Sequence, residues 1–172
     1  MYSKNNPKVS VIITAHNYGC YLNKAIESVL RQTMRDFELI VVNDGSTDNT
    51  PQILEKYKDN TRIMMITLDG VGLAKTANQG IRASKGEYVI RLDADDYFDE
   101  NILLVESTVL DNKPEIGMVY PDYHRINKYG DLLEYIRLMK VNDEVKLLDR
   151  SPLAAGAMYR RSCYDQIGGY NE

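Results

Sequence analysis

The sequence predicts an α/β protein built around a mostly parallel, doubly wound sheet. Short apolar runs of strand character alternate with segments of helical period through roughly the first two thirds of the 172 residues. Two of these runs end in carboxylates, at Asp44 and at Asp93. Because the carboxyl ends of parallel strands meet at one edge of a sheet, both carboxylates are expected beside one ligand crevice.

The first two strands are expected at residues 9–14 and 37–43. Residues 9–14 are β-branched and nearly all apolar, which is typical of a strand that is buried on both faces. A polar turn at 15–20 follows, and apolar residues then recur with the period of a helix. Those helical positions are Leu22, Ala25, Ile26, Val29 and Leu30.

The same alternation continues for two more strand and helix pairs. Thr50-Pro51 opens the next helix, because the missing N–H of proline is not needed in a first turn. A strand is expected at 62–68, and a helix at 72–84 is ended by Gly86. The fourth strand is expected at 87–93, and its helix at about 100–112 ends before Pro114.

After Pro114 the pattern becomes less regular. Residues 116–127 are expected to form one strand, and 128–131 read as a hairpin turn. Residues 132–138 fit either a returning strand or a short helix, and 139–151 are polar and weakly patterned. A further strand is expected at 152–161, with a short helical turn from Ser162.

Composition narrows the class of protein. A net charge of −4 without a basic patch makes nucleic acid an unexpected partner. No apolar run reaches the length of a membrane span, and the polar N-terminus is unlike a signal peptide. Cys20 and Cys163 lack metal-ligand spacing and are expected to be buried, reduced thiols. We therefore expect a single cytoplasmic domain, with peripheral association at the inner membrane face as the open alternative.

The strongest candidate site is the acidic group Asp93, Asp95 and Asp96. Neighbouring carboxylates repel one another, so a bound cation would favour their ionised forms. Oxygen ligands suit Mg²⁺ or Mn²⁺, and Mg²⁺ usually brings the phosphates of a substrate. The alternative is helix capping, because Asp96 or Asp99 could cap the helix at 100–112.

Other polar groups allow both a functional and a structural interpretation. Asp44 lies at a strand end, where it could accept a hydrogen bond from a nucleobase imide, whereas Asp48 is expected to be a structural cap. Lys75 either approaches a diphosphate or is solvated. The segment Gly168-Gly169-Tyr170 is either a turn or a place where the backbone approaches a ligand closely.

Taken together, these segments resemble the family 2 glycosyltransferases, which have the GT-A fold and use nucleotide-sugar donors. Six motifs occur in order along nearly the whole chain, and their combination is far more specific than any one of them. The motifs are residues 11–18 (VIITAHNY), 28–33 (SVLRQT), 38–48 (ELIVVNDGSTD), 72–80 with 86–88, 92–96 (LDADD) and 167–170 (IGGY).

The resemblance implies a GT-A α/β/α sandwich with a Rossmann-like sheet and assigns roles to particular residues. Thr14, Asn17 and Asp44 would hold the nucleobase, with uracil as the expected base. Asp93 would lie near the ribose, while Asp95 and Asp96 would bind Mn²⁺ or Mg²⁺ on the diphosphate. Lys75 would be the basic residue near the donor, and Gly168, Gly169 and Tyr170 would form the loop between donor and acceptor.

The implied reaction is inverting transfer of a hexosyl or N-acetylhexosaminyl group to an acceptor hydroxyl. Residues 1–115 would form the nucleotide-sugar half, and 116–172 the start of the acceptor half. Acceptors would be saccharides or lipid-linked saccharides of cell-surface polysaccharide or glycolipid synthesis. The family places an acidic pair containing the general base after its Gly-Gly-Tyr segment, so the base is expected beyond Glu172, in a chain that looks truncated.

Two alternatives belong to other functional classes. The chain could be a donor-binding module without activity of its own. It could also be a phosphatase of the haloacid-dehalogenase type, in which the first Asp of a D-x-D motif is the nucleophile. That class needs the motif on its first strand and an acidic pair later, whereas here the motif follows the fourth strand.

Overall fold

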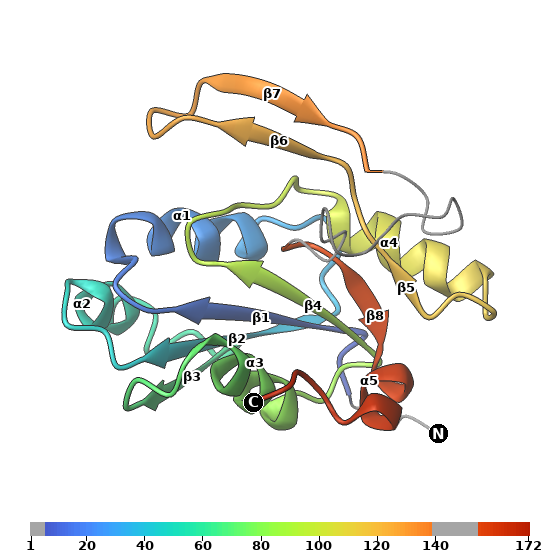
Figure 1. The fold of residues 1–172 in the computed structure, drawn as a ribbon, viewed down its shortest axis with the longest axis horizontal. Coiled ribbons are helices and arrows are strands. Elements are labelled where there is room, and N and C mark those ends of the chain that lie inside the picture. The colour runs from blue at the N-terminus through green and yellow to red at the C-terminus, as the bar shows by residue number, and fades with distance from the viewer. Residues whose placement is uncertain (1–5, 139–154) are drawn as a thin grey trace.

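The computed structural model describes residues 6–138 and 155–172 and contains a six-stranded sheet with a separate two-stranded ribbon (Figure 1). The order in the main sheet is β3-β2-β1-β4-β8-β5, and β6 pairs with β7. The elements are β1 (Val9–Ala15), α1 (Gly19–Leu30), β2 (Phe37–Asp44), α2 (Thr50–Glu55), β3 (Ile63–Leu68), α3 (Leu73–Ala83), β4 (Tyr88–Asp93), α4 (Ile102–Asn112), β5 (Met118–Val119), β6 (Tyr123–Ile126), β7 (Leu132–Ile136), β8 (Met158–Arg160) and α5 (Arg161–Ile167).

The predicted alternation of four strands with four helices is confirmed. β1 pairs in parallel with both β2 and β4, and β3 extends the sheet beyond β2. Every residue of β1 is buried, as its apolar, β-branched sequence predicts for a central parallel strand. The chain therefore places β1 in the middle, with the second and fourth strands on either side of it.

Helices cover both faces of this sheet and enclose two apolar cores. One core joins α1, α2 and α4 to alternate residues of β1, including Val11 and Ile13. The other joins α3 to the opposite face through Ile12 and Ile81. Gly80 allows this close approach, because a Cβ there would lie 2.5 Å from Cγ2 of Ile12. The result is an α/β/α sandwich.

The prediction of one strand at 116–127 is wrong. The segment divides into β5, which pairs with β8, and β6, which forms a hairpin with β7. Pro121 lies at the break, where its missing N–H and restricted φ do not fit the interior of a ladder. Of the two alternatives for 132–138, the returning strand is correct.

The strand expected at 152–161 appears as the shorter β8, antiparallel to β4; residues 139–151 and the start of this expected strand lie outside the described residues. Two arginines anchor this part of the chain. Nε of Arg160 donates to the carbonyl of Ile116 at 2.9 Å, and Nε of Arg161 donates to that of Gly86 at 2.6 Å. Arg160 thus joins β8 to the segment before β5, and Arg161 joins α5 to the segment before β4.

One buried acid stands out in α4. Glu106 is 3% exposed, and within the described part of the chain neither of its carboxyl oxygens has a hydrogen-bond partner. Burial raises the pKa of Glu106 to about 9, so the folded protein holds this group protonated at neutral pH. Its helical period places it on the same face as Leu103 and Leu110, where an apolar residue would be expected.

Two composition-based expectations can be compared with the structure. Within the described residues, no helix has the length and apolar character needed to cross a membrane. Cys20 and Cys163 are free thiols, but Cys20 is exposed and Cys163 is only half-buried, so the predicted burial is wrong for Cys20 and partly met by Cys163. Cys20 lies near the solvent-facing start of α1.

Candidate functional site

Three parallel strands deliver the predicted site residues to one edge of the sheet. In the register of β1 with β4, Thr14 lies opposite Asp93, and on the other side Ala15 of β1 lies opposite Asn43 of β2. The strands that follow β1 in sequence, β2 and β3, lie on one side of it, whereas β4 and the strands after it lie on the other side. The topological switch point is therefore between β1 and β4. Thr14 and Asp93 are therefore neighbours where an open α/β sheet usually binds its ligand.

The acidic motif forms a tight turn at the end of β4. The amide of Asp96 donates to the carbonyl of Asp93 at 3.1 Å, which leaves Asp95 exposed at the tip. Partial burial of the carboxyl group, together with the charges of Asp95 and Asp93, raises the pKa of Asp96 to about 6. Burial also raises the pKa of Asp93, opposed by Arg91 and reinforced by Asp95.

These carboxylates fit a metal that is shared with a ligand. Among the described residues, no three His, Cys, Asp or Glu side chains are placed to hold a metal ion by themselves. Burial and the neighbouring charges of Asp95 and Asp93 disfavour the ionised form of Asp96, and a bound cation would favour it. Proteins commonly bind Mg²⁺ through one or two carboxylates, and phosphate oxygens of the substrate complete its coordination.

Two side chains that the sequence did not single out support the acidic turn. The Oγ of Ser28 accepts a hydrogen bond from the amide of Phe98 at 3.1 Å. Gln32 donates to the carbonyl of Asp99 at 2.6 Å and accepts from the amide of Leu103 at 3.2 Å. Ser28 lies in α1 and Gln32 two residues after its end, and both polar side chains are buried.

Asp44 has a structural role that the sequence did not reveal. Its oxygens accept hydrogen bonds from the amides of Val71 and Gly72 at 2.7 and 2.8 Å, and the residue is 5% exposed. Burial alone would raise the pKa of Asp44, but these backbone donors hold it below its ordinary value. A nucleobase would have to share an oxygen that is already engaged, so contact with the base stays a prediction.

Asp44→Ala should therefore destabilise the fold as well as weaken any nucleotide binding. The amides of Val71 and Gly72 would lose a charged acceptor, which we expect to lower the free energy of unfolding by about 2–3 kcal/mol. Urea denaturation measures this loss. The control is Asp69→Ala, which removes an exposed carboxylate beside the same loop. Equal stability of the two variants would contradict the structural role.

Hydrogen bonds to Asn17 join the loop after β2 to the loop after β1. It adopts a φ of 60°, and its Oδ1 accepts from the amide of Thr47 at 2.8 Å. Asp48 accepts from the amide of Gly19 at 2.8 Å and from that of Thr50 at 2.9 Å, which satisfies the beginnings of both α1 and α2. The structural role predicted for Asp48 is confirmed, whereas contact of Asn17 with a nucleotide stays a prediction.

The remaining predicted residues lie on the α3 side of the sheet. Lys75 is exposed in the first turn of α3. The pKa of Glu172 is lowered mainly by a hydrogen bond from Asn78, and the charge of Lys75 adds to this effect. Gly168 and Gly169 have φ angles of 81° and 96° and form a turn that leads to Tyr170. This turn lies beside α3, because the amide of Tyr170 donates a hydrogen bond to Asn78 of that helix (Figure 1).

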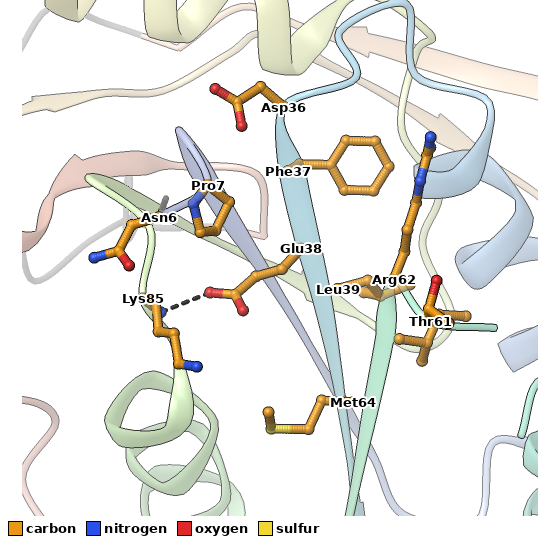
Figure 2. Close-up of a pocket in the computed structure, with 11 residues that line it drawn as sticks. Asn6, Pro7, Asp36, Phe37, Glu38, Leu39, Thr61, Arg62, Met64 and Lys85 are labelled. Atoms are coloured by element: carbon orange, nitrogen blue, oxygen red, sulfur yellow. Dashed lines mark hydrogen bonds between the residues drawn. The ribbon is translucent and has the colours of Figure 1, made fainter. Parts of the chain in front are cut away.

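A separate depression lies at the opposite edge of the sheet. Its volume is about 650 Å³, and Phe37, Glu38 and Arg62 are among the residues lining it (Figure 2). Glu38 there accepts from the amide of Lys85 at 2.6 Å. The depression adjoins the beginnings of β2 and β3, whereas the acidic turn follows the end of β4, so the two do not form one site.

Comparison with known proteins agrees with this geometry. Residues 10–168 match the family described as Glycosyl transferase family 2. A chondroitin synthase of Pasteurella multocida (strain Pm70) is 34% identical over 129 residues, 74% of this chain and 13% of that protein. An uncharacterized glycosyltransferase of Rickettsia bellii (strain RML369-C) is 36% identical over 149 residues, 86% of this chain and 21% of that protein.

The crystal structure of S. aureus TarS 1–349 in complex with UDP-GlcNAc superimposes with a TM-score of 0.78 at 25% identity, covering 96% of this chain and 48% of that one. The chain thus spans 13% to 21% of the length of the two sequence relatives. The expected GT-A type of α/β fold is confirmed. With a family match that covers almost all of its residues, the chain belongs to glycosyltransferase family 2.

Proposed function

We propose that this chain is the donor-binding part of a glycosyltransferase that transfers a sugar from a UDP-sugar to an acceptor hydroxyl. The observation that carries the proposal is the pairing of Thr14 with Asp93 at the switch point, beside the acidic turn. The complex of TarS with UDP-GlcNAc supports a uridine nucleotide with an N-acetylhexosamine or a hexose. The chondroitin synthase relative supports a saccharide acceptor in polysaccharide synthesis.

Each site residue has a proposed task. Thr14, Asn17 and Asp44 line the nucleobase end, and Asp93 binds the ribose. Asp95 and Asp96 would hold Mn²⁺ or Mg²⁺, which when bound neutralises the diphosphate leaving group. Lys75 adds positive charge near the donor.

Transfer with inversion follows if the acceptor hydroxyl displaces the diphosphate directly. Residues 1–115 then form the donor half and 116–172 begin the acceptor half. No residue of the chain is assigned as the general base, and Glu172 is not proposed for that role. Binding to a lipid-linked acceptor at the inner membrane face is the expected setting.

A donor-binding module without transfer activity is the second candidate. The relatives are several times longer than this chain, which favours donor binding and sugar transfer by different segments of such proteins. The phosphatase alternative has no such support, because the acidic motif follows β4 rather than β1 and the family match is to transferases. Both remaining candidates require that the chain bind a nucleoside diphosphate.

The test is a panel of nucleotide sugars, with and without Mn²⁺, read first as thermal stabilisation and then as release of UDP. We expect UDP-sugars with Mn²⁺ to raise Tm, since a ligand at 100 times its Kd adds about 2.7 kcal/mol of stability. UDP release that requires an acceptor saccharide identifies the transferase. Stabilisation without release identifies the binding module, and no stabilisation by any nucleotide sugar contradicts both.

A further inference from the structure

Arg91 lies between the acidic turn and the Gly168–Tyr170 turn. It precedes Asp93 by two positions on β4, so both side chains are on the α3 face of the sheet. Its Nε is 3.4 Å from Oδ1 of Asp93, and its Nη2 is 3.4 Å from Oδ2. On the other side, its guanidinium carbon is 5.7 Å from the ring centroid of Tyr170. One cation thus contacts both groups.

The location of Arg91 makes these contacts important. Its side chain is 16% exposed, in a strand whose other residues before Asp93 are buried. A charge that has lost most of its water needs a carboxylate or an aromatic face as replacement. Asp93 and Tyr170 supply one of each, so removal of either partner should change how the guanidinium is held.

Tyr170 is itself held rigidly by α3. Its amide donates to Oδ1 of Asn78 at 2.9 Å, and its carbonyl accepts from Nδ2 of Asn78 at 2.8 Å. Asn78 is 2% exposed, and its Oδ1 also accepts the hydroxyl of Tyr164. The rings of Tyr164 and Tyr159 stack with centroids 5.9 Å apart. The turn is therefore docked on a packed aromatic and amide support.

We propose that Arg91 is a positioning residue for donor binding, which holds the Asp93 carboxylate in place and is itself held by the docked Tyr170. The inference rests on the proposed function, because Asp93 contacts a donor only if the site binds a nucleotide sugar. Its consequence is that the Gly168–Tyr170 turn and the donor stabilise each other. Undocking of the turn releases Arg91, and release of Arg91 allows Asp93 other rotamers.

The test is a double-mutant cycle on UDP affinity in Mn²⁺, measured by calorimetry. Arg91→Leu suits the apolar strand and should weaken UDP binding about tenfold. Tyr170→Leu should weaken it about threefold, and should have no further effect in the Arg91→Leu background, because coupled residues are not additive. Arg91→Lys keeps the charge but loses the two-point contact with Asp93, so it should recover only part of the lost affinity. All variants should keep a cooperative melting transition.

The second measurement is the rate of amide hydrogen exchange in the peptide that covers residues 164–172, in the absence and in the presence of UDP. Arg91→Leu should speed exchange in the free protein, and UDP should slow it in the wild type only. Arg82→Gln is the control, since Arg82 contacts the same segment through Glu172 at 3.4 Å on the surface and should leave UDP affinity unchanged.

Three results would overturn the assignment. The first is equal UDP affinity in the wild type and Arg91→Leu, and the second is a Tyr170→Leu effect of the same size in both backgrounds. The third is unchanged exchange at 164–172 in Arg91→Leu. A wild type that binds no UDP instead contradicts the proposed function itself, and faster exchange in Arg91→Leu would then show a structural contact only.

Discussion

Asp95→Ala should abolish the metal-dependent part of UDP binding while leaving the fold intact. Asp95 is exposed at the tip of the acidic turn, and no described hydrogen bond or ion pair of the structure uses its side chain, so little stability should be lost. Loss of a carboxylate that completes a metal site should weaken UDP binding in Mn²⁺ by roughly 100-fold, or about 2.7 kcal/mol. Calorimetry of UDP in Mn²⁺ and in EDTA measures this effect.

The matched control is Glu100→Ala, which removes an exposed carboxylate from the same acidic stretch but not from the turn. This variant should bind UDP as the wild type does. If UDP affinity in the wild type is the same in EDTA as in Mn²⁺, the role of the metal is wrong. If both alanine variants weaken binding equally, the effect comes from net charge rather than from Asp95.

The second large effect is on stability and concerns Glu106. Its pKa is raised to about 9 in the folded protein from an ordinary value of 4.5, by burial. Below about pH 4.5 both states are protonated, and the group does not affect the pH dependence. Between that pH and about 9 the unfolded chain ionises while the folded chain does not, so stability falls as pH rises.

Glu106→Gln keeps the shape of the side chain and removes this ionisation. We expect it to raise the free energy of unfolding by about 3 kcal/mol at pH 7 and to flatten its decline between pH 5 and 8. Urea denaturation at several pH values measures both quantities. Glu115→Gln, an exposed glutamate just after α4, should leave the pH profile unchanged. A wild type whose stability does not decline over this range would show that Glu106 finds compensation when ionised.

The parallel half of the fold was predictable because its signals are local. Short, largely apolar runs at 9–14 and 37–43 and the helical period between them identify their elements without knowledge of distant contacts. The break between β5 and β6 was also signalled locally, by Pro121, and should have been predicted. The pairing of β8 with β4 joins segments far apart in sequence, and no local pattern reveals such a partner.

The site was predictable in position but not in its internal contacts. Strand ends placed Asp44 and Asp93 at one edge, as the structure shows. The amides that surround Asp44 come from residues 71 and 72, in a loop that follows another strand. Hydrogen bonds of this kind depend on tertiary packing, so a carboxylate that looks free for a ligand can already be engaged.

The antiparallel insertion of β8 has a consequence for synthesis of the chain on the ribosome. Within residues 6–138 and 155–172, β8 is the strand that pairs with one edge of β4, and β5 pairs with β8 as well. Until residues 158–160 leave the ribosome, the β4 edge remains open, and an unpaired strand edge is a template for association with other chains. Fragments that end before residue 158 should therefore aggregate, whereas fragments that extend past residue 160 should remain soluble.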